Sequence, residues 1–291
     1  REGGGPGRGQ PRLSARQSSL AAPTPTLPRS GGGWSAAIFT KMALDLPPDL
    51  VSALRAARRV VASTGAGVSA ESGISTFRDA QTGLWAKYRP EDLATPQAFL
   101  RNPRMVWEWY EWRRSVVATV EPNPGHHALA RIEAARSAAG LDFLLVTQNV
   151  DGLHAKAGSR NLVELHGNIR RTICFDRRHP AESWPATDDP PPLCAECGAM
   201  LRPDVVWFGE TLPPAALRRA QQAAAECDLF LSIGTSTLVQ PAAELPFIAG
   251  SNGATVVEIN PDATPLSRLA DFVLREKAGI ALPALADAML A

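Results

Sequence analysis

A glycine-rich turn follows the first apolar run of the chain. The run Val60 to Thr64 leads into GAGVSA, residues 65–70, which fits the G-x-G-x-x-G/A pattern of turns that bind dinucleotides. Glycines in such a turn let backbone N–H groups approach a pyrophosphate, although many glycine turns serve close packing only. A dehydrogenase carries an acidic residue about twenty positions further on, but here the polar loop Ser72 to Asp79 occupies that part of the chain. The turn therefore indicates a dinucleotide ligand and disfavours hydride transfer.

Polar residues and glycines also follow the later apolar runs. Ligands of open α/β sheets bind beyond the carboxyl ends of the strands, so residues that directly follow the strands share one edge of the sheet. Each residue taken alone is explained equally well as an ordinary cap or turn residue. Their repetition after successive runs makes a common ligand site the better interpretation. The residues concerned are Gln148, Asn149, Val150, Asp151, His166, Gly167, Gly234, Thr235, Ser236 and Asn260.

His166 is the histidine among them. The pKa of an unperturbed imidazole lies near neutral pH, which suits proton transfer, yet a single histidine after a strand is more often structural. Three further histidines, His126, His127 and His154, lie in helical or capping contexts and are interpreted as structural.

The elements that must position these residues alternate in type from Met42 onward. Apolar, β-branched runs alternate with helical patterns, which predicts an α/β fold: a Rossmann-like, doubly wound parallel sheet with helices on both faces. Residues 42–79, 136–167 and 206–291 are expected to form this domain, and the insertions 80–135 and 168–205 a smaller one. The predicted strands are Val60 to Thr64, Phe143 to Thr147, Leu162 to Leu165, Leu229 to Ile233, Thr255 to Ile259 and Phe272 to Leu274. The predicted helices are Pro48 to Arg58, Pro96 to Val120, Gly125 to Ala139 and Ala215 to Glu226.

Charge and composition exclude several classes of partner. The 291 residues carry a net charge of +1, with 45% hydrophobic and 20% charged residues, so no strong field favours nucleic acid or an anionic membrane. No apolar run is long enough for a membrane span, and no stretch has the layout of a signal peptide. We therefore expect a cytoplasmic monomer with neither nucleic acid nor membrane among its partners.

Residues 1–41 differ in composition from the rest of the chain. They are rich in Gly, Pro, Ser and Arg and show no hydrophobic period, which predicts a disordered leader. Met42 is a natural starting point for the folded part, in which case the leader is an upstream or artificial extension. An Arg-rich, Ser-rich leader also resembles an organellar transit peptide, although this one holds more Gly and Pro than an amphipathic helix tolerates.

Six ordered motifs within about residues 50–285 resemble those of the sirtuin family. They read GAGVSAESGISTFRD, TQNVDGLH, LVELHGN, VVWFGE, GTSTLVQP and VEIN. The resemblance implies an NAD-dependent protein-lysine deacylase that releases nicotinamide and transfers the acyl group to ADP-ribose, giving 2'-O-acyl-ADP-ribose. NAD would thus be a co-substrate, and acyl-lysine proteins would be the partners.

The resemblance also implies a sequence of steps. The acyl oxygen attacks the anomeric carbon of the nicotinamide ribose, nicotinamide leaves, and an alkylimidate joins the peptide to ADP-ribose. His166 then acts as general base on a ribose hydroxyl, which attacks the imidate carbon. Asn149 and Asp151 would line the pocket for nicotinamide and the reacting ribose, because a carboxamide needs paired donors and acceptors.

Further residues at matching positions would bind the two substrates. Phe77 would shield the reactive carbon from water. An acyl-lysine peptide would lie as an added strand along Val206, Trp207, Phe208 and Gly209. The residues expected to contact NAD, besides Asn149 and Asp151, are Gly65, Ala66, Gly67, Ser69, Phe77, Arg78, Gln148, Gly234, Thr235, Ser236, Asn260 and Ala278.

Tyr110 and Arg113 are the candidates for recognition of the acyl group. Their i, i+3 spacing puts them on one face of a predicted helix, where they resemble the Tyr-x-x-Arg pair of desuccinylase-like (class III) sirtuins. Succinyl and malonyl groups end in a carboxylate, which Arg can bind through two charge-assisted hydrogen bonds and Tyr through a third. The alternative is an exposed Arg on a helix whose Trp residues fill the core. With the resemblance, we expect a preference for negatively charged acyl groups and possible activity on acetyl groups.

The cysteines depart from the family pattern. Sirtuins of this type carry a structural zinc on two Cys-x-x-Cys pairs, and here Cys194 and Cys197 form one pair, whereas Arg177 replaces the second cysteine of the Cys174 pair. Tetrahedral structural zinc needs four ligands, so either His179 or Asp176 substitutes or the site is lost. Bound zinc is therefore doubtful from the sequence alone. The fourth cysteine, Cys227, is expected in the core.

Two other functions use the same motifs. An ADP-ribosyl transferase or NAD hydrolase would need the NAD site without an acyl-lysine acceptor, and a non-catalytic sensor of NAD or acyl-lysine would need no general base. The expected substrate segment and the pair Tyr110 and Arg113 argue against the first, and His166 with Asn149 and Asp151 against the second.

Overall fold

The computed structural model contains a parallel sheet with helices on both faces. The structure describes residues 44–74, 93–184 and 187–291, and residues 43–291 form one unit. Six strands, all parallel, are arranged in the order β3-β2-β1-β6-β7-β8. From β1 the chain adds strands first toward one edge of the sheet, as far as β3, and then toward the other edge, from β6 to β8. The predicted fold class is thus confirmed. The strands are β1 (Arg59–Thr64), β2 (Asp142–Thr147), β3 (Leu162–Glu164), β6 (Leu229–Ile233), β7 (Thr255–Ile259) and β8 (Phe272–Leu274).

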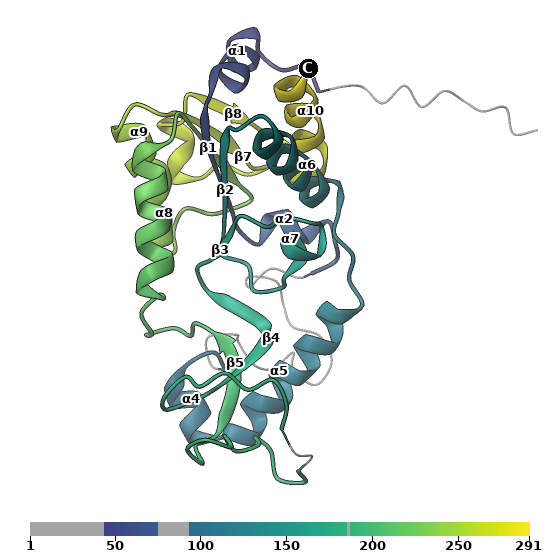
Figure 1. Cartoon of the computed structure of the whole chain (residues 1–291), viewed down its shortest axis with the longest axis vertical. Coiled ribbons are helices and arrows are strands. Elements are labelled where there is room, and N and C mark those ends of the chain that lie inside the picture. Colours follow the sequence, from purple (N-terminus) through teal and green to yellow (C-terminus); the bar gives the residue numbers. More distant parts are fainter. Residues whose placement is uncertain (1–43, 75–92, 185–186) are drawn as a thin grey trace, which may run out of the picture. The chain divides into compact units, whose positions relative to one another are not determined.

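Alternate residues of each strand pack into cores on opposite faces of the sheet. Val60 and Ala62 of β1 join one core, whereas Val61 between them joins the other. The first core is covered by α1 (Pro48–Ala56), α6 (Pro124–Ala138) and α10 (Ala278–Leu290), and the second by α8 (Pro214–Glu226) and α9 (Leu245–Ser251). Figure 1 shows α8 and α9 on one side of the sheet and α6 and α10 on the other.

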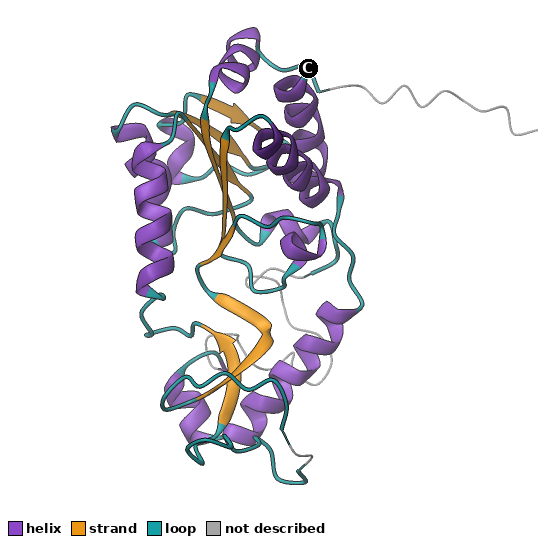
Figure 2. Ribbon diagram, viewed as in Figure 1, coloured by secondary structure: helices purple, strands orange, loops and turns teal. Residues whose placement is uncertain are grey.

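A smaller module is built from α4 (Pro96–Arg101), α5 (Pro103–Ala118) and the antiparallel pair β4 (Gly167–Cys174) and β5 (Leu201–Val205). Figure 2 shows this two-stranded ribbon beside α4 and α5. The single helix predicted for Pro96 to Val120 is wrong, because Asn102 leaves the helical conformation and its side chain accepts from Met105 N–H. Pro103 then begins α5 at a position where a missing N–H costs nothing.

Helix α6 packs against α10 and β2 and contributes Leu129 and Ile132 to the first core of the sheet. The helical part of the smaller module that the structure describes is therefore α4 and α5. No helix within the described ranges combines the length and apolarity needed to cross a membrane.

Candidate functional site

The loops after β1 and β6 interlock where the strand order reverses, the usual ligand position in such sheets. A Cβ at Gly67 would lie 2.8 Å from the Cα of Gly234, and one at Gly234 would lie 2.6 Å from the backbone nitrogen of Val68. Gly65 N–H donates to Ile233 O at 3.0 Å, and Gly67 N–H to Gly234 O at 2.9 Å. The glycines thus serve contact between the two loops, and their N–H groups are used inside the protein. Contact of this turn with a pyrophosphate stays a prediction.

A hydrogen-bonded network joins the loop after β2 to the loop after β1. Ser69 Oγ donates to Asp151 Oδ2 at 2.8 Å, and Asn149 Nδ2 donates to Ser69 Oγ at 3.1 Å and to Gly65 O at 3.0 Å. All three side chains are buried. Burial raises the pKa of Asp151, and the bonds that its carboxyl accepts from Leu153 N–H and Ser69 oppose this effect. The structure therefore brings three predicted site residues into one network with fixed side-chain orientations.

Two buried histidines adjoin this network. His126 Nδ1 accepts from the backbone N–H of Asn123 at 3.3 Å, so in the neutral ring Nε2 carries the proton, 3.4 Å from Ser69 Oγ. His154 Nε2 lies 2.9 Å from Thr64 Oγ1. Burial lowers the pKa of His126 to about 4 and that of His154 to about 3, so both rings are neutral at neutral pH. The sequence predicted a structural role for His126 from its helical or capping context. It did not indicate that the ring lies next to Ser69.

His166 follows β3, the neighbour of β2 in the sheet. Its Nδ1 lies 2.9 Å from Gln148 O, and because a carbonyl only accepts, Nδ1 is protonated and Nε2 is the basic nitrogen of the neutral ring. Burial lowers the pKa of His166, and the hydrogen bond to Gln148 offsets part of this effect. Gly167 has a φ of +79°, and a Cβ there would lie 2.1 Å from Asp204 O, so only glycine lets β4 start here. His166 is thus held as a neutral base at the sheet edge.

The residues after β6 and β7 are tied to the same edge. Gln148 Nε2 donates to Thr235 Oγ1 at 3.2 Å, and Asn260 Nδ2 donates to Thr235 O at 2.9 Å. Ser236 is half-buried next to Thr235. Ala278 begins α10 with its side chain in the core, so only its backbone could contact a ligand.

Two further candidates cannot be placed at this edge. Phe77 and Arg78 lie outside the described residues.

Ala66 is an exposed residue of the glycine turn, and its N–H has no acceptor among the described residues. Ala66 therefore offers the backbone donor of this turn that could meet a phosphate.

Tyr110 and Arg113 lie one turn apart on α5. Tyr110 is 2% exposed, and its hydroxyl accepts from Trp207 Nε1 at 2.9 Å. Burial raises the pKa of Tyr110 to about 12. The guanidinium carbon of Arg113 lies 5.2 Å from the centroid of the Trp109 ring. Burial lowers the pKa of Arg113, while Tyr110 and Asp151 oppose this effect.

The segment Val206 to Gly209 turns away from β5 and is not itself a strand. Val206 N–H donates to His166 O and Phe208 N–H to Ala94 O, both at 2.9 Å. The side chain of Trp207 is 2% exposed, whereas that of Phe208 is 46% exposed. Binding of a peptide strand along this segment stays a prediction. Such a strand would have to pair with main-chain groups other than the N–H groups of Val206 and Phe208, which already donate within the protein.

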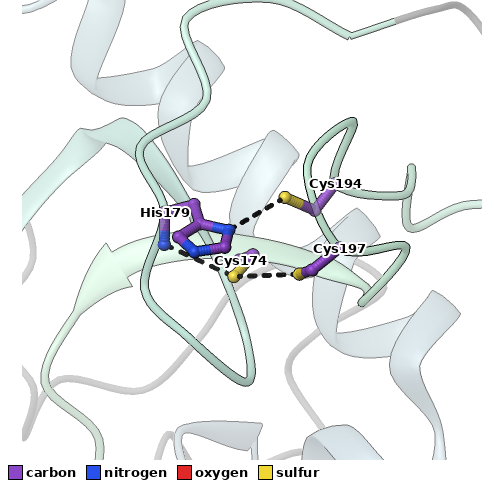
Figure 3. Close-up of side chains that lie close together, drawn as sticks. All are labelled: Cys174, His179, Cys194 and Cys197. Carbon is purple, nitrogen blue, oxygen red and sulfur yellow. Dashed lines mark hydrogen bonds between the residues drawn. The ribbon is translucent and has the colours of Figure 1, made fainter.

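A separate cluster of metal-ligating side chains lies in the smaller module. One ligand atom from each of Cys174, His179, Cys194 and Cys197 lies within 4.8 Å of every other (Figure 3). Cys174 and Cys197 are 3.8 Å apart at Sγ, and Cys194 Sγ lies 3.7 Å from His179 Nδ1. Zn–S bonds of about 2.3 Å place tetrahedral sulfurs about 3.8 Å apart. The donor set and spacing therefore fit a zinc ion, and the candidate Asp176 is not part of the cluster.

The local backbone explains how His179 reaches this cluster. Arg178 has a φ of +57°, and Cys174 N–H donates to His179 O at 2.9 Å, so the chain doubles back directly after β4. The N–H groups of Arg177 and His179 donate to Cys174 Sγ at 3.3 and 3.4 Å. The side chain of Arg177 cannot ligate a metal, but its backbone supports the neighbouring sulfur.

Comparison with known proteins identifies relatives of the chain. The sequence pattern of the Sir2 family matches residues 65–241. An NAD-dependent protein deacylase of Aquifex aeolicus is 49% identical over 229 residues, covering 78% of this chain and 94% of that protein. Another, from Thermus thermophilus, is 54% identical over 233 residues, covering 79% and 90%. A crystal structure of a Sir2 homologue in complex with NAD has 46% identity and a TM-score of 0.77, covering 85% of this chain and 95% of that one.

The family match contains the loops that follow β1, β2, β3 and β6. The matched residues 65–241 include the glycine turn, the network around Asn149 and Asp151, His166 and the loop after β6. The chain therefore belongs to the Sir2 family.

Proposed function

We propose that the protein is an NAD-dependent protein-lysine deacylase with a preference for acyl groups that end in a carboxylate, such as succinyl and malonyl. The relatives named NAD-dependent protein deacylases support the reaction class. The observation that carries the acyl preference is the position of Tyr110 and Arg113 one turn apart on α5, where the guanidinium carbon of Arg113 lies 5.2 Å from the centroid of the Trp109 ring. A cation and a phenol at this place would complement a substrate carboxylate.

The two side chains would recognise the carboxylate in different ways. A guanidinium presents paired N–H donors in a planar fork, which matches the two oxygens of a carboxylate. Tyr110, with its pKa raised to about 12 by burial, keeps its hydroxyl proton at neutral pH and adds one donor. An acetyl group ends in a methyl and offers no acceptor to either side chain, so it would gain nothing from this pair.

The residues at the strand ends would carry out the reaction. NAD supplies the ribose carbon from which nicotinamide departs and the ribose hydroxyl that receives the acyl group. His166, neutral with a basic Nε2, is suited to take the proton of that hydroxyl. Asn149 and Asp151, fixed through Ser69, would hold the carboxamide and the ribose. Gln148, Thr235 and Asn260 would form the wall toward the rest of the nucleotide.

Three peptides that differ only in the acyl group on one lysine test the proposed function. We expect incubation with NAD to yield nicotinamide, free lysine and 2'-O-acyl-ADP-ribose, with kcat/KM higher for succinyl- and malonyl-lysine than for acetyl-lysine, as read by mass spectrometry. Free ADP-ribose without peptide turnover would instead indicate an NAD hydrolase, and modified peptide an ADP-ribosyl transferase. Binding of NAD and peptide without any product would indicate a sensor.

We also propose that the smaller module holds one zinc ion on Cys174, His179, Cys194 and Cys197. The fit of the donor atoms to a tetrahedral site supports this assignment. The ion would tie the end of β4 to the turn that carries Cys194 and Cys197, and its function would be structural because all four ligands come from the protein.

Metal analysis of purified variants tests the zinc site. The wild-type protein should contain close to one zinc per chain, and His179→Ala should lose affinity by more than the roughly 10- to 100-fold that removal of an outer-shell partner costs. Asp176→Ala is the matched control and should retain the metal, since Asp176 is exposed and lies outside the cluster. Zinc content near zero in the wild type, or equal loss in both variants, would contradict the assignment. Competition with a chromogenic chelator gives the affinities.

A further inference from the structure

A buried polar chain leads from β5 to Tyr110 and has no part in the reaction described above. It consists of Arg202, Glu210, Trp207 and Tyr110, linked in that order by hydrogen bonds and ring contacts. Trp207 belongs to the expected substrate segment, but its side chain points into the protein and is 2% exposed. The indole N–H is bonded inside the protein, to the hydroxyl of Tyr110, which points to a role there.

The first part of the chain is an ion pair that fixes the indole. Arg202 is 1% exposed and donates to Glu210 through two nitrogens, at 2.6 and 2.9 Å, and to Val205 O at 2.7 Å. Its guanidinium carbon lies 3.3 Å from the centroid of the Trp207 ring. Glu210 in turn accepts from the backbone N–H of Trp207 at 2.7 Å. A buried ion pair with this many satisfied bonds leaves the indole little freedom to move.

The second part of the chain determines the polarity of Tyr110. Trp207 Nε1 donates to Tyr110 Oη at 2.9 Å. An indole nitrogen can only donate, so the phenol oxygen must be the acceptor in this bond. The proton of the phenol must therefore be directed to a different acceptor. An ionised carboxylate is purely an acceptor and matches a phenol held in this state.

We propose that Trp207 is a positioning residue for acyl recognition, which holds Tyr110 as a hydrogen-bond donor to the carboxylate of the acyl group. The inference rests on the proposed function, because an acyl group without a carboxylate gains nothing from such a donor. Two further observations support it. Burial raises the pKa of Tyr110 to about 12, so the phenol keeps its proton. Tyr110 also packs edge-on against Trp109, with ring centroids 4.6 Å apart, which limits other orientations of the phenol.

Trp207→Phe tests the inference, because phenylalanine keeps a ring under Arg202 and removes the N–H. With a succinyl-lysine peptide, KM should rise roughly 3- to 10-fold while kcat stays within about twofold. With the acetyl-lysine version of the peptide, KM should rise by a smaller factor, so the ratio of the two kcat/KM values should shift toward acetyl-lysine. Trp107→Phe is the matched control, since Trp107 is a buried tryptophan of the same helix that packs against Trp184 and lies in a different core cluster from Tyr110. This control should leave the ratio of kcat/KM for the succinyl-lysine peptide to kcat/KM for the acetyl-lysine peptide unchanged.

A double variant separates positioning from a general effect on the fold. Trp207→Phe combined with Tyr110→Phe should lose no more succinyl activity than Tyr110→Phe alone, because both changes remove one interaction. Additive losses, or an equal rise in KM for both peptides, would overturn the positioning role. If Trp207→Phe lowers the unfolding midpoint so far that kinetics cannot be measured, benzothienylalanine at position 207 keeps the bicyclic shape and replaces only the N–H.

Failure of the inference is distinguishable from failure of the proposed function. If Tyr110→Phe and Arg113→Met both leave the succinyl preference intact, the acyl assignment is wrong and the role of Trp207 falls with it. If these two variants abolish the preference while Trp207→Phe retains it, the acyl assignment stands and the positioning role alone is refuted.

Discussion

Replacing His166 with alanine should lower kcat for deacylation about 10²- to 10⁴-fold, the range that a positioned general base contributes. The geometry behind this expectation is the bond between His166 Nδ1 and Gln148 O, which leaves Nε2 as the only basic ring nitrogen. Exchange of labelled nicotinamide into NAD in the presence of an acyl-lysine peptide should persist in the variant. In the proposed order of steps the base acts only after nicotinamide has left, so the earlier step should not depend on it.

The pH profile of the wild-type protein gives an independent check on the same residue. The pKa of His166 is lowered by burial, so the active, neutral form exists above a pKa that is itself below the ordinary value of about 6.5. We expect kcat/KM to be constant through neutral pH and to fall only at lower pH. His127→Ala, on the exposed side of α6, is the matched histidine control and should have wild-type rates. Equal loss of exchange and deacylation in His166→Ala would contradict a role as the late base.

The strands of the sheet could be predicted because each is a short buried run that ends at a polar residue or a glycine. The observed bounds of β6, β7 and β8 are those expected, and β1 and β2 start one residue earlier. Both faces of the sheet are covered, so the runs are mostly apolar and almost entirely buried. The strand-end residues then follow from topology, because parallel strands bring their carboxyl ends to one edge.

The smaller module was harder to predict because its elements are short and depend on contacts distant in the sequence. The break between α4 and α5 rests on one Asn-Pro step, Asn102 and Pro103, within a helical pattern. β4 and β5 are separated by the segment that holds Cys194 and Cys197, and their pairing contains an irregularity between Asn168 and Thr172. Neither strand shows the regular alternation that marks a ribbon in sequence.

Within the site, sequence predicted which residues gather but not how they are paired. Asn149 and Asp151 were expected at the pocket, yet their link through Ser69 depends on how the loops after β1 and β2 approach each other. The same holds for His179, which was one of two candidate ligands until the turn at Arg178 brought its ring beside Cys174 and Cys194. Such pairings are set by backbone geometry, which the order of residue types does not record.

Arg113→Met should lower kcat/KM for succinyl- and malonyl-lysine peptides about 10²- to 10³-fold, the size expected when one partner of a buried charge pair is truncated. Methionine fills similar space and leaves a substrate carboxylate without its counter-charge, whereas an acetyl group loses no partner. Activity on acetyl-lysine should therefore stay near its wild-type level or rise. Steady-state kinetics on peptides that differ only in the acyl group measure the two effects. Arg104→Met, an exposed position on the same helix, is the matched control and should change neither activity.

Arg113→Lys distinguishes recognition by a fork of donors from recognition by charge alone. Lysine keeps the cation but loses the planar pair of N–H groups, so an intermediate loss of succinyl activity is expected if Arg113 binds both carboxylate oxygens. Recovery of full activity in Arg113→Lys would mean that charge is sufficient and that Tyr110 supplies the only directional bond. Equal loss of succinyl and acetyl activity in Arg113→Met would remove Arg113 from acyl recognition altogether. In that case Arg113 would have to serve the reaction common to all acyl groups.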